Sequence, residues 1–248
     1  MLKPNTVATL LLAGLVTMAH PAVAGTLPAT LEQALQGSEL DQADAWSYRK
    51  TAVVSAMGKK TVRTVTRWDM SKPVGKRCTV VSVEVLRGDA SKDKEETPCG
   101  EGKDRETYGD LKKTLDAASS IETVSEDDTE AVYRVVPGNA QQPGFHMGGV
   151  NVDLSDDDAK DMIGTLHVTK TGPGGPYVDR FALQLRKPVG NLIASVSKLD
   201  ITYHYSPDQA TGARLLRGMD LDLDMTMFAV INVTTVVHTR YDEYKRIQ

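Results

Sequence analysis

The chain has 248 residues, of which 40% are hydrophobic and 25% charged, and its formal net charge at pH 7 is −4. A mildly acidic chain whose charges are spread along the sequence is a poor partner for nucleic acid. No segment after residue 24 approaches the roughly 20 consecutive apolar residues of a membrane-spanning helix, so no integral membrane segment is expected in the remainder of the chain.

The first 24 residues have the pattern of a secretory signal peptide. Lys3 precedes an apolar core of 13 residues, Val7–Ala19, and small residues occupy positions 22 and 24. The core is shorter than a spanning helix, which favours a cleaved signal over the alternative of a retained membrane anchor. We therefore expect a periplasmic or secreted protein. Gly25 stands where a lipid-anchored protein would need cysteine, so the expected product is soluble.

The expected mature protein, residues 25–248, is a single β-rich domain of 224 residues, and the loss of Lys3 takes its net charge to −5. Its first element is a short helix, indicated by the capping-box pattern of Thr30 and Gln33. Residues 46–57 and 61–70 then predict a β-hairpin, because valine, threonine and aromatic residues flank a turn-like Gly-Lys-Lys. Residues 77–86 predict a third strand.

The chain has two cysteines, Cys78 and Cys99. In an exported protein they are expected to form a disulfide, which would close a loop of about 20 residues and contribute about 3 kcal/mol to stability. Two separate thiols are the alternative. The segment 87–104, which includes Cys99, is dense in charged residues and glycine, so we expect it to form a solvent-exposed excursion.

A second helix is predicted from about residue 105 to 119, since apolar residues recur there at spacings of three and four. The rest of the chain predicts a long antiparallel meander with turn-forming clusters between its strands. The expected fold class is α+β, predominantly antiparallel β, with two or three short helices. The predicted strands of the meander are 121–124, 131–136, 162–170, 177–186, 193–205, 214–227 and 232–244.

No motif indicates a catalytic or metal site in a convincing context. The segment 195–198 fits the S-x-x-K pattern of penicillin-recognising serine enzymes and 170–172 fits K-T-G, but their order is reversed and the serine lies in a predicted strand. The mature histidines are scattered singly, which favours hydrogen-bonded or surface histidines over metal ligands. We expect no catalytic residue, no metal and no cofactor. An enzyme whose residues converge from distant strands would nevertheless give a similar sequence.

The segment Met219–Met227 alternates strictly between apolar and polar residues, which predicts a strand with one apolar and one polar face. The acidic row is expected to be solvated or paired with basic residues of a neighbouring strand. Two interpretations of the apolar row stay open. It packs in the core, or its adaptable methionines line a site for a flexible apolar ligand. The apolar row is Met219, Leu221, Leu223, Met225 and Met227, and the acidic row is Asp220, Asp222 and Asp224.

The order of expected elements resembles that of the LolA/LolB-like superfamily of lipoprotein-localisation carriers. In addition, the stretch from Arg67-Trp68-Asp69 through Pro73 and Gly75 into the strand 78–86 is similar to a segment of uncharacterised exported proteins associated with that superfamily. The resemblance implies an open, strongly curved sheet, a half-barrel, whose concave side is covered by helices and holds an acyl chain or other apolar ligand. With three phenylalanines in the chain, such a lining would consist of Met, Leu, Val and Trp.

The resulting hypothesis is a soluble periplasmic protein, not an enzyme, that binds a lipidic or other apolar ligand and acts as a carrier. The alternative is an envelope protein with a filled core that acts through contacts with another envelope protein. A membrane barrel is disfavoured because the chain is poor in the aromatic residues that form interfacial girdles. Strand alternation alone selects the candidate ligand-binding residues Trp46, Trp68, Leu221, Leu223, Met225 and Met227.

Overall fold

The computed structural model describes residues 27–37, 41–88, 99, 105–138, 145–147, 150–152, 161–190 and 194–247. The predicted signal peptide and most of the charged segment 87–104 lie outside these described residues.

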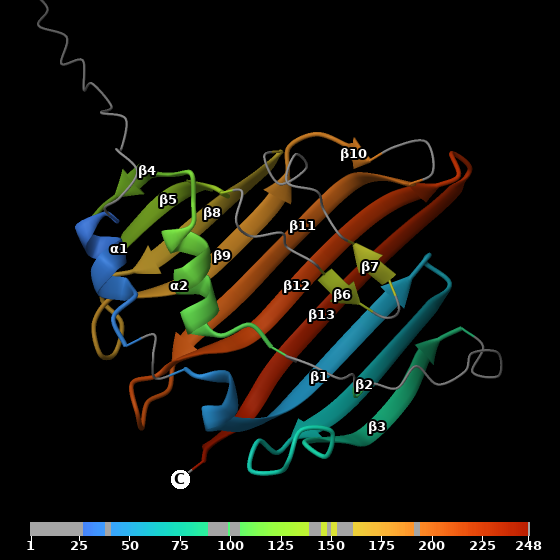
Figure 1. Cartoon of the computed structure of the whole chain (residues 1–248), viewed down its shortest axis with the longest axis horizontal. Coiled ribbons are helices and arrows are strands. Elements are labelled where there is room, and N and C mark those ends of the chain that lie inside the picture. Colours follow the sequence, from blue (N-terminus) through green and yellow to red (C-terminus); the bar gives the residue numbers. More distant parts are fainter. Residues whose placement is uncertain are drawn as a thin grey trace, which may run out of the picture.

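The described chain forms one large antiparallel sheet with two α-helices on one of its faces (Figure 1). This confirms the predicted α+β class with an open, curved and predominantly antiparallel sheet. The strands of the sheet are β1 (Trp46–Ala56), β2 (Lys60–Trp68), β3 (Cys78–Arg87), β4 (Ser120–Glu126), β5 (Glu130–Val136), β8 (Met162–Thr169), β9 (Tyr177–Leu185), β10 (Val189–Gly190), β11 (Ala194–Pro207), β12 (Arg214–Met227) and β13 (Ile231–Arg246). Two short strands missed in the sequence, β6 (Phe145–Met147) and β7 (Val150–Val152), pair as a separate sheet.

The strand order is β3-β2-β1-β13-β12-β11-β9-β8-β5-β4, with β10 attached to β11. The predicted meander is confirmed along the second part of the chain, because β4, β5, β8, β9, β11, β12 and β13 pair in this order, each with its neighbour in the series. The N-terminal strands β1 to β3 form a second meander. It joins the first where β1 pairs with β13, in a register that sets Trp46 opposite Arg246.

The helix α2 (Tyr108–Asp116) begins with a capping box, in which Thr107 Oγ1 accepts from the backbone N–H of Asp110 and the Asp110 carboxylate accepts from that of Thr107. Its apolar stripe is buried as the spacing predicts. The helix α1 (Ala29–Ala34) exists, but its predicted capping box is wrong, because the N-cap is Pro28 and Thr30 lies inside the helix. Thr30 Oγ1 instead donates to Glu126 at 2.9 Å. A short 3₁₀ helix, η2 (Ala43–Ala45), precedes β1.

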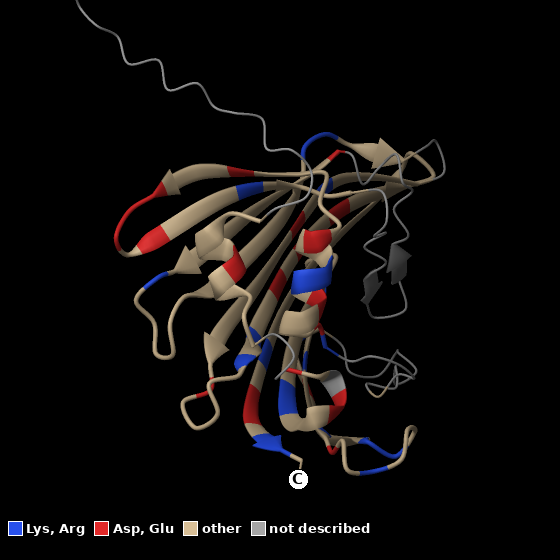
Figure 2. Ribbon diagram, turned by 60° about the vertical axis from the view of Figure 1, so that its left-hand side comes forward, with Lys and Arg blue, Asp and Glu red and all other residues tan. Residues whose placement is uncertain are grey.

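The core lies between the helices and the concave face of the sheet. Strand alternation turns one buried side chain after another toward α1 and α2, among them Leu166, Phe181, Ile201 and Leu221. The opposite face is polar, and Figure 2 shows acidic and basic positions both distributed along the strands. The acidic row of β12 belongs to that face, as predicted, where Lys198 pairs with Asp222.

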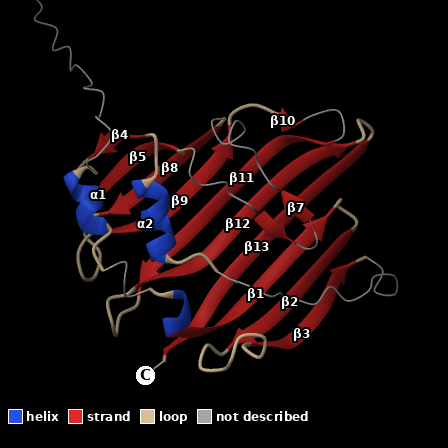
Figure 3. Cartoon of the chain, in the orientation of Figure 1, coloured by secondary structure: helices blue, strands red, loops and turns tan. Residues whose placement is uncertain are grey.

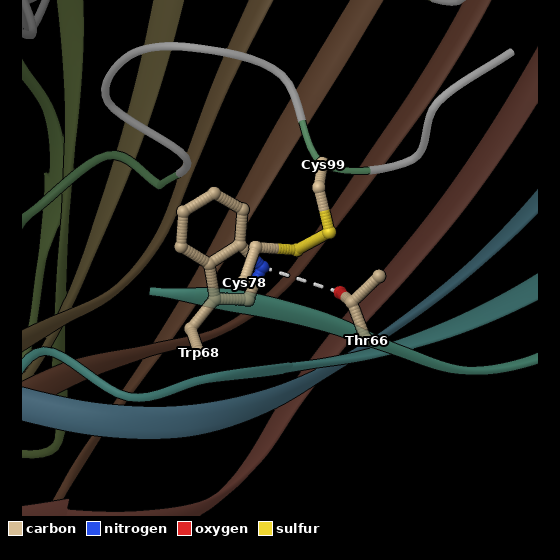
Figure 4. Close-up of a disulfide and its surroundings, with 4 residues drawn as sticks. All are labelled: Thr66, Trp68, Cys78 and Cys99. Atoms are coloured by element: carbon tan, nitrogen blue, oxygen red, sulfur yellow. Dashed lines mark hydrogen bonds between the residues drawn. A yellow bond between two sulfur atoms is a disulfide. The ribbon is translucent and has the colours of Figure 1, made fainter. Parts of the chain in front are cut away.

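Cys78 and Cys99 form the predicted disulfide, with their Cα atoms 5.6 Å apart (Figure 4). The bond attaches residue 99 to the first residue of the edge strand β3. The indole of Trp68 lies beside it, and its Nε1–H donates to Thr66 Oγ1 at 3.2 Å.

Candidate ligand-binding face

The two α-helices cover only part of the concave face. The helix α1 contacts β8 and β9, and α2 contacts β12, so both lie over the central and β4-side strands (Figure 3). Beneath them the apolar side chains of β8, β9, β11 and β12 are packed and buried. This part of the concave face is a filled core.

The concave face continues, uncovered by these helices, across β1, β2 and β3. Trp68 and Thr66 of β2 are buried on the concave side, so alternation places Val62 on that side too. Val62 pairs with Val54 of β1 and with Val85 of β3. These residues and their concave neighbours on β3 form what we call the valine surface: Val54, Val62, Val80, Val83 and Val85.

The valine surface is apolar and partly open to solvent. Val54 packs against the edge of the main core and remains only partly buried. Further out, Val80 is 41% and Val83 54% exposed. Val54, Val62 and Val85 form a continuous row, while Thr64 and Thr66 stand between β1 and the more exposed Val83 and Val80. A contiguous apolar row at the surface is typical of an interaction surface, because exposed apolar residues are normally isolated.

The two tryptophans selected from the sequence lie in different environments. Trp68 is buried and stacks on Tyr48, with ring centroids 6.2 Å apart and an interplanar angle of 9°. It stands between the main core and the valine surface. Trp46 is also buried, but it packs with Ala213 and Leu215 in a small cluster separate from the main core.

The four candidates from β12 also lie in two different environments. Leu221 and Leu223 are buried in the main core, while Met225 and Met227 are partly exposed at the far end of the strand. Met225 packs against the core edge and pairs with Val233 of β13. The structure therefore does not gather the six candidates into one cluster, and their contact with a ligand stays a prediction.

Sequence reasoning missed the valine surface. Its signal was present in β2, where Val62 and Thr64 continue the alternation of Thr66 and Trp68. The edge strand β3 carries the same signal more weakly, since β-bulges shift its register against β2.

A buried ion pair holds the start of α2 against the segment that precedes β1. The Arg105 side chain is 2% exposed and that of Asp41 is fully buried, and their atoms Nη2 and Oδ1 are 2.6 Å apart. Asp41 Oδ2 also accepts from the backbone N–H of Tyr108 at 2.8 Å. The guanidinium lies 5.4 Å from the ring centroids of both Tyr48 and Tyr244.

Burial is the largest single influence and lowers the pKa of the Arg105 guanidinium, but the hydrogen bonds to Asp41 and the electrostatic interactions with Asp41 and the neighbouring tyrosines together outweigh it, so the pKa is raised. Arg105 therefore stays charged. Its Nη1 and Nη2 atoms donate to Asp41, while its buried Nε has no hydrogen-bond partner among the described residues. This arrangement fastens the start of α2 to the segment that precedes β1.

Within the described ranges, no three or more His, Cys, Asp or Glu side chains come together in a way that would hold a metal ion. The helices in these ranges are all too short or too polar to cross a membrane.

No protein-family model matches the sequence, and no curated protein matches it. A similar solved structure is the crystal structure of a LolA superfamily protein from Nitrosomonas europaea, which is 12% identical, has a TM-score of 0.37, and covers 89% of this chain and 93% of that one. Its superfamily is the one that the order of elements resembles. At this identity and score the likeness adds nothing to what the strand order already shows about the fold.

Proposed function

We propose that this protein binds a lipidic or other apolar ligand on its concave face. The observation that supports the proposal is the valine surface, an apolar strip that continues the main core beyond the cover of α1 and α2. Apolar area that remains in contact with water favours association with an apolar partner, by about 25 cal/mol for each Å² removed from water.

The energetics of transfer favour a long ligand. Each buried methylene contributes about 0.8 kcal/mol, whereas association costs on the order of 4–15 kcal/mol in lost freedom. About fifteen buried methylenes are therefore needed before binding reaches the micromolar range, even with the smallest of these association costs. We expect long acyl chains to bind and short fatty acids to bind weakly.

The N-terminal sequence supports an exported, periplasmic setting for this activity, and we propose a carrier that shields its ligand from water and passes it on, without catalysing a reaction. Because Leu221, Leu223 and Trp68 are all buried in the main core, the ligand would contact Met225 and the valine surface instead. The filled core beneath the helices also favours a second candidate function, an envelope protein that uses the exposed valines of β3 to contact another protein.

Two glutamate variants of β2 test the proposal. Val62 and Val65 lie on the same strand, both partly buried, but an odd spacing places them on opposite faces. Val62→Glu puts a charge on the valine surface and is expected to weaken binding of a long-chain fluorescent fatty acid by about tenfold or more, since a buried charge is costly. Val65→Glu, the matched control, is expected to leave binding within about twofold of the unaltered protein.

Native mass spectrometry of the purified protein, followed by organic extraction, measures any ligand that it carries. If no lipid is extracted and no long-chain fatty acid binds, the proposal of an apolar ligand is wrong. If a fatty acid binds but both variants weaken it equally, the ligand does not occupy the valine surface.

A further inference from the structure

The face of the sheet opposite the helices carries a polar groove that is separate from the valine surface. The groove has a volume of about 420 Å³ and crosses four neighbouring strands, β8, β9, β11 and β12. This volume lies within the range of small-molecule sites. Its lining residues are Thr165, His167, Arg180, Ala182, Gln184, Thr202, His204 and Asp220.

Strand register arranges these residues in two adjacent rows. In the first row Ala182 pairs with both Thr165 and Thr202, so short side chains lie side by side across three strands. In the second row Arg180 pairs with both His167 and His204. The first row thus forms a low floor and the second a taller wall that carries nitrogen donors.

Arg180 is held in place by a neighbouring histidine. His167 Nδ1 lies 2.6 Å from Glu130 Oε1, and His167 Nε2 lies 3.0 Å from Arg180 Nη2. Because a guanidinium can only donate, Nε2 must accept, and Nδ1–H therefore donates to Glu130. These two contacts fix the tautomer of His167 and orient Arg180 along the wall.

The groove retains hydrogen-bonding groups that the protein does not use. Among the described residues, Arg180 makes one side-chain hydrogen bond, to His167, which leaves its other N–H groups available. Three further polar groups line the groove: the hydroxyls of Thr165 and Thr202 and the amide of Gln184. None of these side-chain groups has a hydrogen-bond partner among the described residues. Hydroxyl and guanidinium donors together suit an oxyanion.

The carboxylate at the groove's edge is already engaged. Asp220 contacts His204 Nε2 at 3.0 Å, His238 Nδ1 at 2.9 Å and Arg240 Nη1 at 3.1 Å. The Arg240 side chain lies over its register partner Gly218 on β12, where a Cβ atom would stand 2.5 Å from Arg240 Nη1. Asp220 is therefore engaged from both sides, by His238 and Arg240 of β13 and by His204 of β11.

Two further acidic groups lie near the wall. Glu130 accepts from His167 and is exposed, and Asp179 precedes Arg180 at the β-bulge between β8 and β9. Burial raises the pKa of Asp179, while the positive charge of Arg180 opposes that rise. Arg180 is thus the charged donor that lines the groove with unused N–H groups.

We infer that this groove binds a phosphate-bearing group, with Arg180 as the charged contact and Thr165 and Thr202 as hydroxyl donors. Arg180 would donate in parallel to two phosphate oxygens, a geometry that the planar guanidinium favours. The phosphate belongs either to a small soluble compound or to the headgroup of an anionic phospholipid. This inference stands independently of the concave-face proposal, because the two surfaces lie on opposite faces of the sheet.

Titration with inorganic phosphate, monitored through the amide resonances in NMR spectra, tests whether the groove binds the phosphate of a small soluble compound. Vesicles of phosphatidylglycerol, compared with vesicles of phosphatidylcholine alone, test the headgroup source. Shifts at Thr165, Arg180 and Thr202, or selective binding of the anionic vesicles, are the expected results. If phosphate produces no saturable shifts and neither vesicle binds, the inference is wrong.

Three variants locate the site. Arg180→Gln is expected to weaken binding by about tenfold or more, the usual cost of losing a charge-assisted hydrogen bond. Ala182→Leu fills the floor without removing any charge and is expected to weaken binding too, which keeps the test valid if the first variant folds poorly. Arg63→Gln is the matched control, since Arg63 is an exposed arginine on the same face of the sheet that pairs with Glu84 outside the groove. Equal losses in the Arg180 and Arg63 variants would mean that general surface charge, not the groove, attracts the phosphate.

Discussion

Replacement of Asp41 by alanine is expected to destabilise the protein strongly. The substitution leaves the Arg105 guanidinium, whose side chain is 2% exposed, without its counter-charge, and it leaves the backbone N–H of Tyr108 without its acceptor. Removal of one partner of a buried ion pair costs about 3–5 kcal/mol. Since domains unfold with about 5–15 kcal/mol, such a loss is a large share of the total stability.

Urea unfolding, monitored by circular dichroism, measures this loss of stability. Two further variants test whether the loss comes from the buried charge. The double variant Asp41→Ala/Arg105→Met removes both charges and is expected to recover most of the stability, because no uncompensated charge remains buried. Asp116→Ala breaks the exposed pair with Lys112 on α2 and is expected to cost less than about 1 kcal/mol. A cost below about 1 kcal/mol for Asp41→Ala, or additive losses in the double variant, would refute the argument that the pair matters through burial.

Three other predictions concern stability and use the same unfolding measurement. Replacement of both Cys78 and Cys99 by serine removes the bond that closes a separation of 21 residues, and a loss of about 3 kcal/mol is expected; a loss below about 1 kcal/mol would contradict the entropic argument. Leu221→Ala is expected to cost about 2–5 kcal/mol because the side chain is buried in the main core, and a cost near zero would show that this part of the concave face is not filled. Asp179 and Asp220 are expected to respond to pH with opposite signs. Burial raises the folded-state pKa of Asp179, so its contribution is present at low pH and lost as the pH rises through that raised pKa. Asp179→Asn should therefore stabilise the protein at pH 7 and lose this advantage below about pH 4. For Asp220 burial also raises the pKa, but hydrogen bonds from the neighbouring histidines and arginine outweigh it and the net shift is downward. Its contribution is present at neutral pH and lost as the pH falls through the lowered pKa, so Asp220→Asn should destabilise at pH 7 and the difference should vanish in acid. Shifts of the same sign for both variants would contradict this assignment.

Much of the fold follows from local sequence patterns. The alternation of Met219–Met227 predicted which face of β12 each of these side chains occupies, since side-chain direction in a strand depends on whether a position is odd or even. The spacing of Tyr108, Leu111 and Leu115 similarly predicted α2. These features are local, so they need no knowledge of the tertiary structure.

The candidate site required information that the sequence does not display. Alternation places Leu221 and Val62 on the same concave face, but it does not say that α2 lies over β12 and leaves β2 uncovered. The sequence therefore left the apolar row of β12 open between core and ligand lining, and the structure buries its two leucines in the core. The polar groove is even harder to predict from the sequence, because Thr165, Arg180 and Thr202 become neighbours only through the register of three strands and the β-bulge that follows His167.

The pairing of β1 with β13 has a consequence for how the chain reaches this structure. Trp46 and Arg246 are partners across 200 positions of sequence, and β1 can complete its ladder only when the last strand of the chain is present. Until then β1 has a partner in β2 but an open edge on its other side, with the valine-rich β3 close by. Contacts of such long range slow folding, and an unpaired edge invites association with other chains. We therefore expect the final sixteen-residue strand to act as the closing step of folding, so that truncation within β13 would leave the three N-terminal strands prone to aggregation.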